Sequence, residues 1–296
     1  MIVITAPTST IGRQVLENVL KDGEPVRVIA RDPSRLPEQI RDRLEVVKGS
    51  HGDLDVVTEA FEGADSVFWL LPPNPQAESV EAAYLDFTRP ASQALVSRGV
   101  KRVVGITALG RGLPLNSGYV AGSLAMDDLI AGTGVSYRAL TMPSFMDNLL
   151  RQVATIKNQG VISTPIAGDR KMPTVATRDI AAAAARLLLD ADWSGVGEVP
   201  LLGPEDLSFN DMARIMSEVL GQQVRFQQTA FEAYNDRFLS FGMSEAMARG
   251  MTDMARAKNE GLDNAVPRTP QSTTSTSFRE WCEDVLKPAV LADDLP

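Results

Sequence analysis

The chain has 296 residues, 44% of them hydrophobic, and its 38 acidic and 29 basic residues give a formal net charge of −9. This length is enough to bury a large core, as one α/β domain or as two interleaved lobes. The negative charge, with basic residues scattered among carboxylates, argues against a nucleic-acid-binding surface, because neutralising phosphates requires a dense basic patch.

Residue counts and apolar runs argue against further classes of function. Cys282 and His51 are the only residues of their types, which excludes an internal disulfide and leaves no cluster typical of a zinc or iron site. Apolar runs such as 181–189 are too short for a membrane span, and Met1 leads into a predicted strand rather than a signal peptide. We expect a cytoplasmic protein without a metal, whose partner is a small molecule or a protein.

The N-terminal segment, residues 1–12, predicts a buried strand that turns tightly into a helix. Unpaired backbone N–H groups and the positive end of the helix dipole meet at such a junction, so it can hold a diphosphate without a basic side chain. The dinucleotide-binding fingerprint has three glycines here, and only the third, Gly12, is present. Ala6 and Ser9 occupy the other two places and Pro7 fixes φ inside the loop, which predicts a stiff turn.

This junction alone leaves two interpretations open, because strand, turn and helix with one glycine also begin α/β domains that bind no nucleotide. The next residues favour cofactor binding, since strands and helices alternate. Predicted strands are 26–30, 44–47, 66–71, 102–106 and 135–140, and predicted helices are the segment after Gly12, 54–61, 80–97 and 179–189. Such alternation predicts an α/β fold with a doubly wound, Rossmann-like parallel sheet and helices on both faces.

A smaller C-terminal α/β lobe for the substrate is predicted beyond about residue 195, where the rhythm changes. Its predicted strands are 198–202 and 223–227, and its predicted helices are 209–220, capped near Ser208, 231–259 and 278–286. Met243, Met247, Met251 and Met254 recur at helical spacing and either pack in the core or line a flexible pocket. We expect a dinucleotide-binding domain at 1–195 and a substrate lobe at 196–296, interleaved with parts of 141–175.

With these landmarks, the sequence resembles the NmrA-like group of atypical short-chain dehydrogenase/reductases over nearly its whole length. This group includes NADPH-binding redox sensors and quinone reductases. No single motif is specific to the group, but the combination is. The segments that carry the resemblance are 26–35, Gly52-Asp53 together with 63–68, 142–149, 177–181 and 202–204.

The resemblance implies a set of cofactor-binding positions. The loop after the second strand meets the adenosine ribose, an aspartate after the third strand meets adenine, and residues after the fourth strand flank the cofactor. The implied cofactor-binding residues are Thr5, Pro7, Thr8, Ser9, Thr10, Ile11, Gly12, Arg31, Arg35, Asp53, Leu71, Pro72, Thr107, Pro143 and Phe145.

The residues after the second strand favour NADP(H) over NAD(H). An acidic residue there would pair with the ribose hydroxyls of NAD, whereas Arg31 and Arg35 offer positive charge to a 2′-phosphate. NAD(H) stays possible, because Asp32 weakens the preference and both arginines also fit solvated loop positions. His51 fits the adenine side of the site better than a catalytic role.

The implied catalytic residues are Thr107, Tyr119 and Ser123. Tyr119 begins a match to tyrosine-x-x-x-lysine in which Ser123 replaces the lysine. In the family that lysine holds the nicotinamide ribose and lowers the tyrosine pKa, so its loss predicts a phenol pKa near the ordinary value of about 10. An equally good interpretation is that Tyr119 is a surface or pocket aromatic residue that transfers no proton. Lys171 and Tyr84 are further candidate donors that also fit solvated or packing positions.

Three functions remain open from the sequence. The first is an NAD(P)H-dependent oxidoreductase that reduces a quinone-like or aromatic polyketide-like carbonyl, because such acceptors delocalise negative charge and need little protein acid. The second is a non-catalytic NADP(H)-binding redox sensor that acts through a protein partner, which the missing lysine favours. The third is a protein that has lost nucleotide binding. The substrate and the oligomeric state stay open, with a homodimer as one option.

Overall fold

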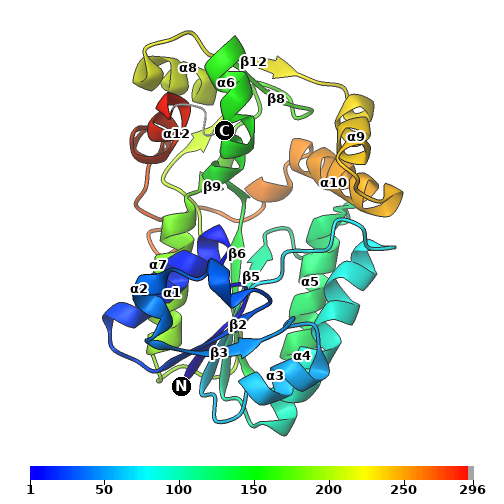
Figure 1. Ribbon diagram of the computed structural model, residues 1–296. Helices are drawn as coiled ribbons and strands as arrows, with labels where there is room; N and C mark the ends of the chain where they lie inside the picture. Colours follow the sequence, from blue (N-terminus) through cyan, green and yellow to red (C-terminus); the bar gives the residue numbers. More distant parts are fainter. Residues whose placement is uncertain (293–296) are drawn as a thin grey trace. The chain divides into compact units, whose positions relative to one another are not determined.

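The computed structural model describes residues 1–292, and the chain divides into two compact units built from interleaved segments (Figure 1). The first unit consists of Met1–Ala108, Val120–Thr141 and Ile180–Val199, and the second of Leu109–Tyr119, Met142–Asp179 and Pro200–Pro296. The assignment of 1–195 to the cofactor and 196–296 to the substrate stays a prediction.

A seven-stranded sheet forms the centre of the first unit, in the order β10-β6-β5-β4-β1-β2-β3. The strands are β1 (Ile2–Ile4), β2 (Val26–Ala30), β3 (Leu44–Lys48), β4 (Ser66–Trp69), β5 (Arg102–Ala108), β6 (Ser136–Met142) and β10 (Val196–Pro200). Strand β1 runs parallel to β2 and β4, β2 to β3, and β4 to β5. The chain leaves β1 toward β2 and β3 and then returns to β4 on the other side, which makes a topological switch point at the carboxyl end of β1.

Helices cover both faces of this sheet. They are α1 (Thr10–Lys21), α2 (Glu38–Arg41), α3 (Leu54–Ala60), α4 (Phe87–Ser97), α5 (Tyr119–Ala131) and α7 (Thr177–Leu189), with a 3₁₀ turn η1 (Pro33–Arg35) and a π turn η2 (Ala82–Asp86). Figure 1 shows α1 and α7 on one side of the sheet and α3, α4 and α5 on the other. The predicted doubly wound, Rossmann-like sheet is therefore confirmed.

The second unit has two small sheets and a helical core. Its elements are β7 (Ser144–Phe145), η3 (Met146–Gln152), α6 (Val153–Gln159), β8 (Val161–Thr164), β9 (Met172–Val175), β11 (Asp206–Leu207), α8 (Phe209–Leu220), β12 (Arg225–Gln228), α9 (Phe231–Ser240), α10 (Glu245–Asn259), η4 (Leu262–Asn264), α11 (Phe278–Trp281), η5 (Cys282–Leu286) and α12 (Lys287–Leu291). Strand β8 pairs in parallel with β12, and β9 pairs with β7 and antiparallel with β11. Ile156, Met216, Phe278 and Trp281 lie in its buried core.

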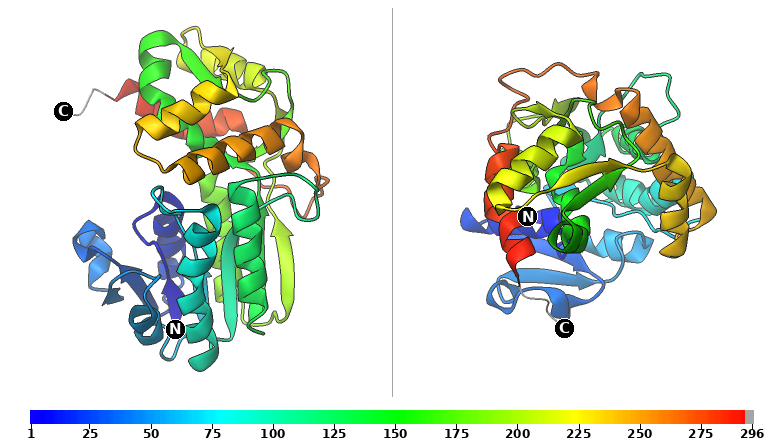
Figure 2. Two further views of the ribbon diagram at one scale, coloured as in Figure 1. Left: turned by 90° about the vertical axis from the view of Figure 1, so that its right-hand side faces the viewer. Right: turned by 90° about the horizontal axis from the view of Figure 1, so that it is seen from above.

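The predicted helix at 231–259 is two helices, α9 and α10, which lie side by side (Figure 2). Gly242 follows α9 with φ of +81°, and this left-handed backbone, which favours glycine, ends the helix. Of the predicted methionine stripe, Met247 is fully buried, whereas Met251 and Met254 are half-buried. The stripe therefore contributes to packing mainly through Met247.

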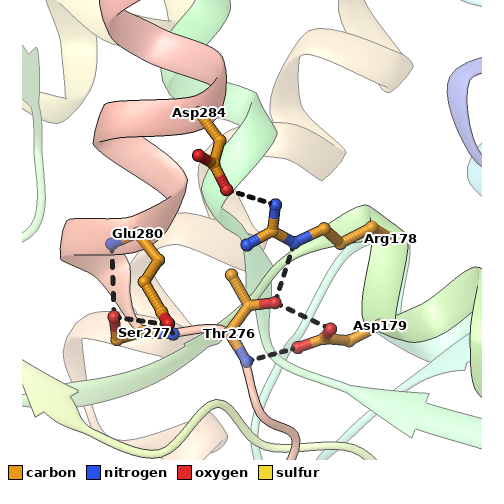
Figure 3. A network of polar contacts seen from close by, with 6 residues as sticks. All are labelled: Arg178, Asp179, Thr276, Ser277, Glu280 and Asp284. Carbon is orange, nitrogen blue, oxygen red and sulfur yellow. Dashed lines mark hydrogen bonds and ion pairs between the residues drawn. The ribbon is translucent and has the colours of Figure 1, made fainter.

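A polar network in the second unit explains one segment of the family resemblance (Figure 3). The backbone N–H and the hydroxyl of Thr276 donate to the two carboxylate oxygens of Asp179, at 3.0 and 2.8 Å. Arg178 donates from Nε to the Thr276 hydroxyl at 2.9 Å and pairs with Asp284 at 2.7 Å. Arg178 and Asp179 thus fasten the segment before α11 to the start of α7, which is a structural role.

Candidate cofactor site and hydroxyl pair

The turn between β1 and α1 keeps the shape of a phosphate loop although it lacks two glycines. Ala6 has φ of +48° and is the one non-glycine residue with positive φ among residues 1–292. Its carbonyl accepts hydrogen bonds from the backbone N–H and the hydroxyl of Ser9, at 3.0 and 2.8 Å. Alanine thus adopts the left-handed conformation that favours glycine, at a steric cost of roughly 1–2 kcal/mol.

Gly12 is the position where the loop tolerates no side chain. A Cβ atom at Gly12 would lie 2.1 Å from the carbonyl oxygen of Ala6 and 2.9 Å from the hydroxyl of Ser9. The Gly12 N–H also donates to the Ser9 hydroxyl, which caps α1, at 3.1 Å. The third glycine of the fingerprint therefore keeps the helix close to the loop, as the sequence predicts.

Three backbone donors of this loop remain available to a ligand. In the described part of the chain, the N–H groups of Thr8, Thr10 and Ile11 make no hydrogen bond. They surround the N-terminal end of α1, where the helix dipole favours an anion. The Ser9 hydroxyl is already engaged with Ala6 and Gly12, so these three amides are the donors of the loop that are left for an anion.

The two residues that flank this turn on the strand side are buried. The Thr5 hydroxyl donates to the carbonyl of Phe68 at 2.9 Å and accepts from the N–H of Leu70 at 2.9 Å. Thr5 therefore joins the ends of β1 and β4, and Pro7 is also buried. Both shape the loop, while the exposed Thr8 and Thr10 face solvent.

Positive charge is available after β2, where the sequence predicts the adenosine ribose. Arg31 and Arg35 are exposed. Asp32, the acidic residue between them, accepts hydrogen bonds from the hydroxyl and the N–H of Ser34, at 2.6 and 3.1 Å. These bonds hold the pKa of Asp32 below its usual value. The Asp32 carboxylate therefore caps the N-terminus of η1.

His51, after β3, is a neutral side chain in an aromatic surrounding. Its ring meets Trp69 edge-on at 5.2 Å and Phe87 at 4.8 Å between ring centroids. Burial, together with the nearby charge of Arg31, lowers the pKa of His51 to about 4. Its buried Nε2 has no hydrogen-bond partner within the described residues. Neither Trp69 nor Phe87 is singled out by a sequence motif, although Trp69, an aromatic residue at the end of β4, is a usable signal.

The remaining positions near the adenosine end follow the ends of β3 and β4. Asp53 is exposed at the start of α3 and makes no capping bond with its side chain. Leu71 is buried and Pro72 is exposed after β4. In the second unit, Pro143 is buried before β7 and Phe145 is half-buried at its end.

The structure brings together two of the predicted catalytic residues. Thr107 on β5 and Ser123 on α5 share a hydrogen bond of 2.9 Å between their hydroxyls, and both side chains are buried. Tyr119 lies one turn before Ser123 on the same helix, and burial raises its pKa to about 12. The expected value near 10 is therefore wrong, because the loss of the lysine is combined with desolvation of the phenol.

The described residues also bear on metal and membrane binding. Among residues 1–292, no group of three or more His, Cys, Asp or Glu side chains is arranged to hold a metal ion. None of the helices in that range combines the length and the apolar character that crossing a bilayer requires.

Two family models and several known proteins match the chain. The model described as NAD(P)H-binding matches residues 8–191, and that of the NmrA-like family matches residues 131–282. The chain is 27% identical over 287 residues to a (4-alkanoyl-5-oxo-2,5-dihydrofuran-3-yl)methyl phosphate reductase of Streptomyces griseus, which covers 95% of this chain and 96% of the relative. It is 25% identical over 288 residues to an NAD(P)H azoreductase of Xenophilus azovorans, with 96% and 97% covered.

A solved structure shares the fold. It is that of the NADPH-dependent quinone oxidoreductase QOR2 of Escherichia coli, complexed with NADPH, with a TM-score of 0.78 and 22% identity over 95% of this chain and 98% of the other. The similarity covers both units of the present chain.

Proposed function

This chain belongs to the NmrA-like family and has an NAD(P)H-binding domain, and we propose that it is an NADPH-dependent oxidoreductase of conjugated, quinone-like or aromatic polyketide-like acceptors. The first unit binds the cofactor, and the second provides the substrate lobe. The single observation that carries the proposal is the loop from Thr5 to Gly12, where three unpaired amides meet the N-terminus of α1.

The phosphate loop contains no basic side chain, and its residues still fit a dinucleotide. The amides of Thr8, Thr10 and Ile11 hold the diphosphate, and Gly12 keeps α1 close. Arg31 and Arg35, which are both exposed, bind the 2′-phosphate, while the Asp32 carboxylate between them accepts hydrogen bonds from Ser34. Asp53, Leu71 and Pro72, which follow the ends of β3 and β4 in the same unit, contribute the adenosine side.

The kind of substrate that accepts the hydride follows from the weak proton donors in the candidate site. When bound, the reduced cofactor supplies a hydride. Tyr119, with a pKa of about 12, is a poor proton donor, and the Thr107 and Ser123 hydroxyls are weaker acids still. Quinones and other conjugated acceptors delocalise the charge that they gain, so water can supply the proton afterwards. The relatives named for azo, quinone and oxo-dihydrofuran compounds also act on conjugated acceptors, which supports this substrate class.

Cofactor binding is tested by titrating the protein with NADPH and NADH while following the melting temperature. A ligand at 100 times its Kd stabilises the folded state by about 2.7 kcal/mol, and we expect NADPH to reach this at a lower concentration than NADH. Absence of any shift with either cofactor would remove the proposal. Arg31→Ala should reduce the difference in affinity between NADPH and NADH. Arg13→Ala, at an exposed position of α1, is the control and should leave this difference unchanged.

Turnover is tested by following NADPH absorbance with a menadione-like quinone and with an aromatic polyketide ketone. We expect consumption above the protein-free blank that disappears when the cofactor loop is disrupted. Binding without consumption of NADPH by any acceptor would favour a second function, a redox sensor that acts through a protein partner. The replacement of the family lysine by Ser123 favours that alternative.

A further inference from the structure

The helix before α4 contains a π turn that holds a buried tyrosine. Residues Ala82–Asp86 form this turn, η2, and α4 continues from Phe87. Tyr84 lies in the middle of the turn and is 8% exposed. Single π turns inside helices are uncommon and change the direction of the side chains around them, and they occur often at functional sites.

Pro90 accounts for the π turn. A proline inside a helix has no N–H for the carbonyl four residues earlier and its ring clashes with that carbonyl. Four residues before Pro90 is Asp86, the last residue of η2. In the other π turn of residues 1–292, η5, the residue four positions before Pro288 is Asp284, in the middle of the turn. Both π turns therefore contain the carbonyl with which the proline ring would clash in a regular α-helix.

The ring of Tyr84 packs against a glycine on α5. A Cβ atom at Gly122 would lie 2.7 Å from Cδ2 and 3.2 Å from Cγ of Tyr84, and 2.7 Å from Cγ1 of Val80. Glycine is therefore the one residue type that fits at position 122 beneath this ring. All of these atoms lie in the first unit.

Gly122 immediately precedes Ser123, whose hydroxyl meets that of Thr107 at 2.9 Å. The contact between the Tyr84 ring and the Gly122 backbone limits how closely α5 can approach η2 and how far α5 can rotate about its axis. A change of a few tenths of an ångström or of some degrees there moves the Ser123 hydroxyl, because the two residues are adjacent on a rigid helix.

We propose that Tyr84 is a positioning residue for the Thr107–Ser123 hydroxyl pair, acting through the packing of its ring on Gly122. Val80 completes the surface on which Gly122 rests. The atoms of Tyr84 that meet Gly122 are carbons of its ring. The effect on turnover rests on the proposed function, whereas the effect on the hydroxyl pair does not.

The test compares Tyr84→Phe, which keeps the ring, with Tyr84→Leu, which removes it. Phe61→Leu is the matched control, because Phe61 is a fully buried ring of the same unit at the end of α3. We expect Tyr84→Leu to lower kcat for a quinone by about tenfold to a hundredfold, with the Kd for NADPH within about threefold. Tyr84→Phe should keep kcat within about twofold, and Phe61→Leu should lower the melting temperature alone.

Two results would overturn the inference: equal losses of kcat in Tyr84→Phe and Tyr84→Leu, or no larger loss in Tyr84→Leu than in Phe61→Leu. A crystal structure of Tyr84→Leu gives a readout that needs no turnover. We expect the Thr107 and Ser123 hydroxyl oxygens to lie beyond about 3.5 Å, outside hydrogen-bond distance. A retained bond at the wild-type distance contradicts the inference. An inactive wild-type protein instead contradicts the proposed function, and the crystal structure still tests the role of Tyr84.

Discussion

The phosphate loop and the Thr107–Ser123 pair both depart from the family pattern, and the two departures have different consequences. In the loop, Ala6 replaces a glycine and still adopts φ of +48°, so the amides that follow it keep their place. On α5, Ser123 replaces a lysine, and a neutral hydroxyl pair takes the place of a positive charge. Ala6 thus keeps the backbone conformation of the residue that it replaces, whereas Ser123 cannot supply the charge of the lysine that it replaces.

The largest expected effect comes from Gly12→Ala, which would break the phosphate loop itself. The new Cβ would lie 2.1 Å from the backbone oxygen of Ala6, so the loop or the helix must move. We expect the affinity for NADPH to fall by about a hundredfold, equivalent to about 2.7 kcal/mol. Isothermal titration calorimetry measures this change.

Gly23→Ala is the control for Gly12→Ala. Gly23 has φ of +76°, but nothing lies within 4 Å of a Cβ there. The substitution should therefore reduce stability through backbone strain and leave NADPH affinity unchanged. Equal affinities for Gly12→Ala and Gly23→Ala would show that the loop does not bind the diphosphate.

Thr107→Val tests the side-chain half of the comparison. It preserves shape but leaves the buried hydroxyl of Ser123 without its partner, at a cost of about 1–3 kcal/mol in the free energy of unfolding. The double variant Thr107→Val/Ser123→Ala removes both polar groups and should recover most of that stability. Urea denaturation of the single and double variants gives the coupling energy, and additive losses would mean that the two hydroxyls do not interact.

These two regions also separate what the sequence predicts from what it does not. Strand 26–30 is predicted with the observed bounds, because it is a short run in which every residue except Arg27 is apolar. Helix α5 is not predicted, because its apolar and polar residues do not separate onto two faces as they do in an amphipathic helix. The break between α9 and α10 at Gly242 is also missed, because a single glycine is compatible with a continuing helix.

Within the candidate site, the sequence identifies residues by their place along the chain and not by their contacts. Gly12 is predicted from its spacing to Ala6, within one local turn. The bond between Thr107 and Ser123, and the packing of Tyr84 on Gly122, join different elements and depend on how α5 lies against its neighbours. Such contacts follow from tertiary packing, which a local pattern does not contain.

A smaller effect is expected from Ala6→Gly, which sharpens the backbone half of the comparison. Glycine adopts a positive φ without steric cost, so the variant should gain about 0.5–1 kcal/mol in the free energy of unfolding. NADPH affinity should stay within about threefold, because the same amides are presented. Ala121→Gly, at an exposed position of α5, is the control and should lose about 1 kcal/mol. Loss of stability in Ala6→Gly would contradict the strain assigned to Ala6.

The smallest effect is expected from Tyr119→Phe. Burial raises the pKa of Tyr119 to about 12, so the phenol stays protonated through the neutral and moderately alkaline range and is a weak donor. The kcat for a quinone should therefore change by less than about twofold, and the wild-type profile should show no alkaline limb from Tyr119 below about pH 10.

Ser123→Lys should reverse that outcome. An ammonium one turn along α5 from Tyr119 lowers the phenol pKa, so an alkaline limb should enter the measurable pH range and disappear again in Tyr119→Phe/Ser123→Lys. A steep loss of activity in Tyr119→Phe alone would instead make Tyr119 the proton donor without the lysine. The phosphate loop and the α5 site would then be alike, because Tyr119 would still donate a proton although the lysine charge at position 123 is lost.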